Sequence, residues 1–135
     1  MAMSETLVNI LLVEDEAAHA ELIRRAFELD PSLHLRVVTN LADAEAQLTG
    51  GIPDLLIVDS SLPDGRGVDL LANLIEGPSG GTFPTVLLTS HHEPKLEKEA
   101  LDMGVFRYLV KTPENLFEMS TRIREILDQW NQSRS

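Results

Sequence analysis

The sequence contains no cysteine among its 135 residues. Disulfide bonds and thiolate metal sites are therefore excluded, and this composition suits a reducing compartment. No charged leader followed by an apolar stretch stands at the N-terminus, and no apolar run approaches the length that spans a membrane. We expect a cytoplasmic protein that does not associate with membranes.

Basic residues are scarce as well. The chain has 11 Lys and Arg against 22 Asp and Glu, which gives a formal net charge of −11. Nucleic-acid binding depends on basic side chains that displace phosphate counterions, so direct binding to DNA or RNA is not expected. The composition, 43% hydrophobic and 24% charged, is ordinary for one globular domain with a sizeable core.

Short apolar runs alternate with helical patterns along the chain, an order typical of βαβ units. The predicted strands are Val8–Val13, Leu33–Thr39, Leu55–Val58, Thr85–Thr89 and Phe106–Val110. The predicted helices are Glu16–Leu29, Asn40–Gly50, Gly67–Leu74, Pro94–Met103 and Pro113–Gln129, and a loop is predicted at 76–82. Right-handed crossovers favour a doubly wound, flavodoxin-like α/β fold. We expect a five-stranded parallel sheet with strands in the order 2-1-3-4-5 by chain position and helices on both faces.

In such sheets, ligands bind at the carboxyl ends of the strands. Glu14 and Asp15 follow the first predicted strand, Asp59 follows the third, Thr89 ends the fourth and Lys111 follows the fifth. Three carboxylates in one place would repel each other unless a cation intervened. Carboxylates suit Mg²⁺, and an aspartate can form a phosphorylated intermediate that cationic and hydroxyl groups stabilise.

Five segments carry these strand ends at a characteristic spacing: residues 10–16 (ILLVEDE), 54–59 (DLLIVD), 62–65 (LPDG), 86–90 (VLLTS) and 108–111 (YLVK). Each segment alone is a weak signal, but all five in order are highly specific. With them the chain resembles, over essentially its entire length, the receiver domain of two-component response regulators of the chemotaxis-regulator type. We expect one receiver domain over residues 1–130 and a polar tail at 131–135.

The resemblance implies a role for each matched acidic residue. Asp59 falls at the phosphoacceptor position. Asp15 falls at the position of a direct ligand of Mg²⁺ or Mn²⁺, and Glu14 at that of an acid acting largely through water. The backbone carbonyl of Ser61 would complete the metal site.

The resemblance also implies a switch. Thr89 matches the switch hydroxyl, Tyr108 the switch aromatic, and Lys111 the lysine that pairs with the acceptor and its phosphate. The family usually has proline directly after this lysine, often with a cis peptide bond. Here Thr112 intervenes before Pro113, and this pair is typical of a helix N-cap followed by proline at the first helical position, so we predict a trans Lys111–Thr112 bond.

A receiver of this kind takes a phosphoryl group from a sensor histidine kinase or a phosphotransfer protein. It then acts on an output domain or partner protein. The resemblance implies that the change is read on the face of the fourth helix, fifth strand and fifth helix. Phe106 and Phe117 are candidate exposed apolar residues on this face, and either could equally belong to the core. A homodimer through the same face is consistent with it. Such a domain is not an enzyme, since it catalyses only its own phosphorylation and dephosphorylation.

Three other functions fit the sequence less well. A degenerate receiver that only binds proteins would not need the acidic pair, Asp59, Thr89 and Lys111 together. A dehalogenase-type phosphatase needs a second acid two residues after its nucleophile, and Ser61 stands there. A nucleotide or flavin module lacks support, because acidic residues replace a Gly-rich loop after the first strand. The histidines are interpreted as surface residues (His19, His34, His91 and His92). The resemblance implies a modest influence of His91, two positions after Thr89, on the rate of dephosphorylation.

Overall fold

The computed structural model describes residues 7–76 and 82–134. Within them, five long strands form one parallel sheet in the order β2-β1-β3-β6-β7. Their bounds are β1 (Val8–Val13), β2 (Leu33–Val38), β3 (Leu55–Asp59), β6 (Thr85–Thr89) and β7 (Arg107–Val110). Counted along the chain without the short β4 and β5, this is the predicted order 2-1-3-4-5, and the predicted flavodoxin-like fold is confirmed.

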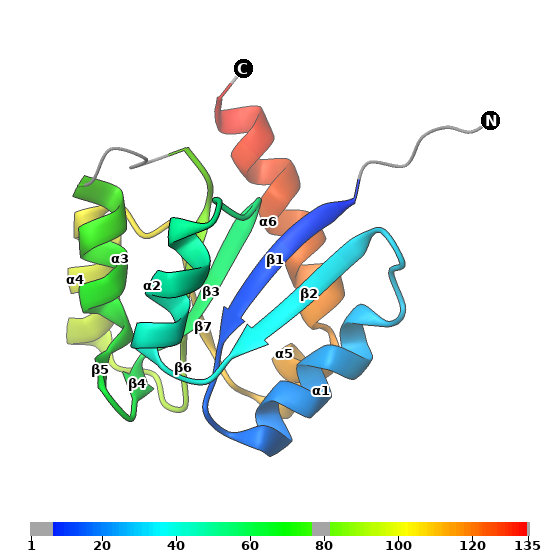
Figure 1. Ribbon diagram of the computed structural model, residues 1–135, viewed down its shortest axis with the longest axis horizontal. Coiled ribbons are helices and arrows are strands. Elements are labelled where there is room, and N and C mark those ends of the chain that lie inside the picture. Colours follow the sequence, from blue (N-terminus) through cyan, green and yellow to red (C-terminus); the bar gives the residue numbers. More distant parts are fainter. Residues whose placement is uncertain (1–6, 77–81, 135) are drawn as a thin grey trace.

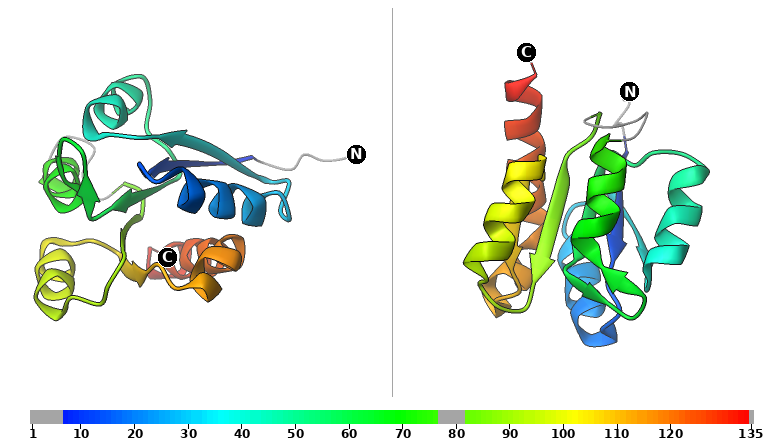
Figure 2. Two further views of the ribbon diagram at one scale, coloured as in Figure 1. Left: turned by 90° about the horizontal axis from the view of Figure 1, so that it is seen from below. Right: turned by 90° about the vertical axis from the view of Figure 1, so that its left-hand side faces the viewer.

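Helices cover both faces of the sheet (Figures 1 and 2). One face carries α1 (Ala17–Phe27), α5 (Pro113–Phe117) and α6 (Met119–Ser133), and the other carries α2 (Leu41–Thr49), α3 (Gly67–Glu76) and α4 (Pro94–Met103). Because all five strands are parallel, their carboxyl ends lie at one edge of the sheet, the lower edge in Figure 1. No helix in the described ranges has both the length and the apolar character that crossing a bilayer requires.

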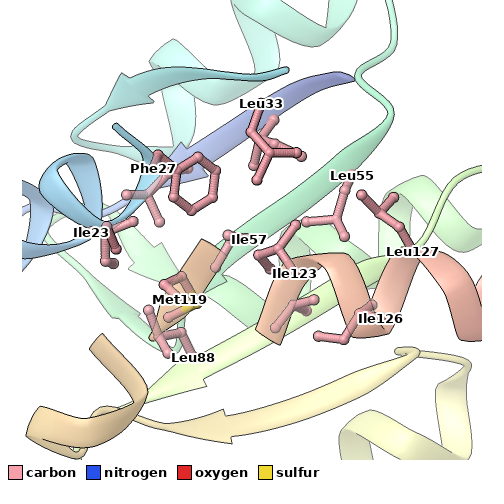
Figure 3. Packing of buried hydrophobic residues seen from close by; sticks show 14 of the residues in the cluster. Ile23, Phe27, Leu33, Leu55, Ile57, Leu88, Met119, Ile123, Ile126 and Leu127 are labelled. Carbon is pink, nitrogen blue, oxygen red and sulfur yellow. The ribbon is translucent and has the colours of Figure 1, made fainter. Parts of the chain in front are cut away.

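Two hydrophobic layers hold the sheet between the helices. On one face, Ile23 and Phe27 of α1 and Ile123 of α6 pack against Ile57 of β3 (Figure 3). On the other, Leu56 and Val58 of β3 pack against residues of α2, α3 and α4. Every residue of β3 is buried, as expected for a central strand with apolar side chains on both faces. The strand that carries Asp59 is therefore enclosed on both faces, as is its neighbour β6, whose residues are also all buried.

A short hairpin follows β3 and was not predicted. It consists of β4 (Ser61–Leu62) and β5 (Gly65–Arg66), which pair in antiparallel fashion. In its turn, the Asp64 carboxylate accepts hydrogen bonds from the backbone amides of Leu41 and Ala42, at 2.8 and 3.0 Å. The hairpin thereby caps the N-terminus of α2, and these backbone hydrogen bonds lower the pKa of Asp64.

The predicted helix Pro113–Gln129 needs correction. Glu118, with φ −103° and ψ 20°, separates α5 from α6, and both helices contact α1. The tail predicted at 131–135 is helical through Ser133, the last residue of α6. In this last turn Ser133 Oγ donates to the Trp130 carbonyl, and the Arg134 guanidinium lies 4.9 Å from the centre of the Trp130 ring.

Other element ends differ by a few residues. Asp59 is the last residue of β3 rather than the residue after it, and α3 runs two residues beyond the predicted Leu74, to Glu76. Most of the predicted loop at 76–82 lies outside the described residues, as do residues 1–6 and 135.

Candidate functional site

Asp59 ends β3 at the carboxyl edge of the sheet, and its side chain is 7% exposed. Backbone contacts fix this end of the strand: the Ser60 amide donates to the Leu88 carbonyl at 2.8 Å, and the Gly67 amide donates to the Ser60 carbonyl at 3.1 Å. A Cβ atom placed on Gly67 would lie 2.1 Å from the Asp59 carbonyl oxygen. Glycine therefore allows the start of α3 to pack directly on Asp59.

Lys111 follows β7, and its side chain, only 2% exposed, points toward Asp59 at the carboxyl edge of the sheet. Its Nζ donates to Asp59 Oδ2 at 3.0 Å and lies 2.6 Å from Glu14 Oε1 and 3.2 Å from His19 Nδ1. The Lys111 amide donates to the Thr89 carbonyl at 2.7 Å, which ties the base of the residue to β6. The sequence-predicted residues Glu14, Asp59 and Lys111 thus meet in one buried cluster.

The charges of this cluster depend on one another. Burial raises the pKa of the Glu14 carboxyl, and it does so more strongly than the contact with Lys111 lowers it. Burial also opposes the charge on Lys111, but its contacts with Glu14 and Asp59 outweigh that effect and raise the Lys111 pKa. The lysine is therefore held as a cation between two carboxylates that share its single charge.

The acidic residues also offer a metal site. Glu14, Asp15 and Asp59 each present a carboxylate oxygen, and these oxygens lie within 4.8 Å of one another. Asp15 is exposed, whereas Glu14 and Asp59 are buried. Glu14 Oε1 has no partner with hydrogen-bond geometry within the described part of the chain, despite the short ionic contact with Lys111. Surplus negative charge and an incompletely satisfied buried oxygen fit a hard divalent cation. Ser61 opens the neighbouring hairpin.

The predicted switch residues contact the loop between β6 and α4. The Thr89 hydroxyl, which is buried, lies 3.1 Å from Glu93 Oε2 and 3.2 Å from the His91 carbonyl. The Tyr108 hydroxyl accepts from the Glu93 amide at 2.9 Å and donates to the His91 carbonyl at 3.3 Å. Thr89 and Tyr108 are therefore joined through the same two loop residues.

The turn after β7 has the predicted form. The peptide bonds of the described residues are trans, Lys111–Thr112 included. Thr112 is the N-cap of α5, where its Oγ1 accepts from the Asn115 amide at 3.0 Å, and Pro113 occupies the first turn. The prediction of a trans bond followed by an N-cap and proline is confirmed.

The sequence interpretation of His19 needs correction, and the alternatives left open for two phenylalanines are resolved. His19 was interpreted as a surface residue, but its side chain is 27% exposed and lies beside Lys111 and Glu16. Its position one turn after the acidic pair on α1 was the available signal. His34, His91 and His92 are exposed, as predicted. Of the two candidate apolar residues, Phe117 is 61% exposed, whereas Phe106 is half-buried against the core and Trp130.

A groove of about 410 Å³ lies beside the segment that follows Asp59, residues 60–66. It is lined by residues that follow Asp59 and by residues of β5 and α4 (Ser60, Ser61, Arg66, Glu93, Lys95, Leu96 and Glu99). Arg66 pairs with Glu99 across it at 2.8 Å. A larger groove, about 500 Å³, lies between α2 and the edge of the sheet and includes none of the clustered carboxylates.

Comparison with known proteins identifies the class. A family model described as "Response regulator receiver domain" matches residues 10–124. The swarming motility regulation protein RssB of Serratia marcescens is 34% identical over 119 residues, which cover 88% of this chain and 52% of that protein.

Solved structures agree. The Mn²⁺-bound form of response regulator Rcp1 superimposes with a TM-score of 0.75 and 26% identity, covering 83% of this chain and 88% of that chain. The phosphorylated cyanobacterial phytochrome response regulator RcpA gives a TM-score of 0.80 and 26% identity, covering 90% and 94%.

The chain thus contains a signalling domain of the two-component class. It belongs to the response regulator receiver domain family, as the resemblance in its sequence predicted. It spans only 28% to 53% of the length of the curated relatives that it matches first.

Proposed function

We propose that this receiver domain accepts a phosphoryl group on Asp59 in a Mg²⁺-dependent reaction and thereby changes its preference for a partner. The observation that carries the proposal is the buried cluster in which Lys111 Nζ lies 3.0 Å from Asp59 Oδ2, beside the acidic pair Glu14 and Asp15. An aspartate in this setting has a cation and a potential metal site next to its nucleophilic oxygens.

The reaction follows from these positions. An Asp59 carboxylate oxygen forms a bond to the phosphorus of a phosphohistidine, the phosphorus–nitrogen bond breaks, and the departing imidazole nitrogen keeps the electron pair and takes up a proton. Lys111 pairs with an oxygen of the transferred group. Glu14, Asp15, Asp59 and the Ser61 carbonyl would hold the metal, which neutralises charge on the phosphoryl oxygens.

The role in a pathway is proposed from the same site. The donor would be a sensor histidine kinase or a phosphotransfer protein, and the receiver of the signal an output domain or partner protein. The chain would act in the cytoplasm, as a domain covering residues 1–130, and not as an enzyme on an external substrate. A degenerate receiver remains the second candidate, and the same experiment separates the two.

The test is phosphorylation by acetyl phosphate with Mg²⁺, followed by intact mass measurement. The parent should gain one labile phosphate, and the gain should disappear with a chelator. Asp59→Asn should gain none, because the amide is a poor nucleophile. Asp69→Asn, which changes an exposed residue of α3, should behave as the parent. Equal uptake by Asp59→Asn would refute the assignment of the acceptor, and no uptake by the parent would favour the degenerate receiver.

A further inference from the structure

The turn that carries Lys111 closes on a single carbonyl group. The carbonyl of Val110, the residue before Lys111, accepts from the Thr112 amide at 2.8 Å and from Asn115 Nδ2 at 2.8 Å. Because Thr112 is only two residues ahead, the first bond folds the chain tightly at Lys111. The second hydrogen bond comes from the side chain of Asn115 on α5 and stabilises this tight turn.

Asn115 holds the turn at both of its ends. Its backbone amide donates to Thr112 Oγ1 at 3.0 Å, and its side-chain amide donates to the Val110 carbonyl. Residues on both sides of Lys111 are therefore attached to one residue. On the side facing the sheet, the Lys111 amide is attached to the Thr89 carbonyl at 2.7 Å. The backbone of Lys111 is thus fixed from α5 and from β6 at once.

The orientation of the Asn115 amide is itself determined. Arg122 Nε donates to Asn115 Oδ1 at 3.3 Å, which leaves Nδ2 as the group that faces Val110. Arg122 is held in turn by Glu118 at 3.0 Å. Asn115 lies on α5 and Arg122 lies in the first turn of α6, on the other side of the break at Glu118. The first turn of α6 therefore supports the turn that follows β7.

We propose that Asn115 is a positioning residue for Lys111: by holding the Val110 carbonyl it keeps Nζ within reach of Asp59 and of the phosphoryl group. This inference rests on the proposed function, because it assigns Asn115 a part in phosphorylation of Asp59. A small displacement of a catalytic group lowers a rate by up to about a hundredfold. A role limited to capping α5 would instead depend on the Asn115 backbone amide and on Thr112 Oγ1, neither of which the side-chain amide supplies.

The experiment is a double-mutant cycle on the full chain. Asn115→Asp keeps the shape of the side chain but lacks the donor, and Asn115→Ala removes it. Each should lower the rate of phosphorylation by acetyl phosphate about tenfold or more in the parent background. In the Lys111→Met background the same substitutions should change the residual rate by less than about twofold, because the group that Asn115 positions is gone. Asn73→Asp, on an exposed position of α3, is the matched control.

Effects of Asn115 substitutions that are equally large with and without Lys111 would overturn the proposal. A second measurement does not depend on phosphorylation or on the folding of Lys111→Met. The Lys111 side-chain ¹⁵N resonance should be observable in the parent and in Asn73→Asp, and should shift or vanish in Asn115→Asp. An unchanged resonance would also overturn the proposal. Absence of phosphorylation in the parent would instead refute the proposed function, and the resonance would still decide the role of Asn115.

Discussion

Lys111 supplies one positive charge to two carboxylates in a space that water barely reaches. The exposed fractions of the three side chains are 2% for Lys111, 0% for Glu14 and 7% for Asp59. Removing one member of a buried ionic cluster usually costs more than the cluster contributes, because the remaining charges stay buried without compensation. The cluster around Asp59 therefore keeps surplus negative charge, which suits a further cation, and its stability depends on the one cation that it has, Lys111.

Lys111→Met should lower the free energy of unfolding of the metal-free domain by about 3 kcal/mol at neutral pH. The sign of its pH dependence follows from Glu14. A carboxyl whose folded pKa is raised above the ordinary 4.5 binds more protons in the folded state, so stability falls as pH rises above 4.5. Without Lys111 this pKa rises further, and the deficit of the variant should shrink between pH 7 and pH 5. Denaturant titrations at both values measure it.

Lys98→Met is the matched control, because Lys98 pairs with Asp102 on the surface of α4. We expect almost no change in stability for an exposed pair. A deficit in Lys111→Met that grows as pH falls towards 5 would contradict the view of Lys111 as the compensating cation.

The hairpin that follows Asp59 contacts two helices, α2 and α4. Asp64 attaches its turn to the N-terminus of α2, and Arg66 attaches it to Glu99 of α4. At its end, the Gly67 amide donates to the Ser60 carbonyl, and Gly67 begins α3. The hairpin after Asp59 is therefore held on both sides, and its position depends on the close contact between Gly67 and the Asp59 carbonyl.

Gly67→Ala should destabilise the domain by about 1–3 kcal/mol, since the added methyl group overlaps the Asp59 carbonyl and forces the backbone apart. It should also slow phosphorylation by acetyl phosphate. Gly50→Ala is the control: Gly50 has φ −80° and its added methyl group would meet only ordinary contacts, 3.5 Å from the nearest atom. Thermal unfolding of both variants gives the comparison. Equal stability of Gly67→Ala and the parent would contradict the close packing at Asp59.

The elements also show where sequence patterns stop being informative. Apolar runs and caps such as Asn40 and Thr112 predicted the strands and most helix starts, because these depend on neighbouring residues. The proximity of His19 to Lys111 joins residues 92 positions apart. The break at Glu118 has no glycine or proline to indicate it. Both depend on how packed elements meet, which local periodicity does not encode.

In the molecule as a whole, Thr89 and Tyr108 connect the carboxyl edge of the sheet to the loop between β6 and α4. Both hydroxyls share the His91 carbonyl, and Glu93 links them through its side chain and its amide. A phosphoryl group on Asp59 would compete with Glu93 and His91 for the Thr89 hydroxyl. Loss of that contact would alter the loop that also holds Tyr108, so a phosphoryl group on Asp59 would bias the arrangement of α4 and β7.

Beryllofluoride with Mg²⁺ should therefore change amide hydrogen exchange mainly between Thr89 and Phe117. Thr89→Ala should reduce these changes at least severalfold, because the hydroxyl that responds is missing. Thr121→Ala, an exposed position on α6, should leave them intact. Changes confined to residues 59–67 would mean that the signal leaves the domain by another face.

Trp130 is the single tryptophan of the chain. Its ring stands edge-on to Phe106, 5.2 Å between centroids, and the neighbouring Gln129 accepts a hydrogen bond from Arg107 at the start of β7. The indole thus lies at the junction of α6 with the strand that carries Tyr108. Its fluorescence originates from that junction alone, so the unlabelled protein contains its own optical probe of the surface on which its state would be read.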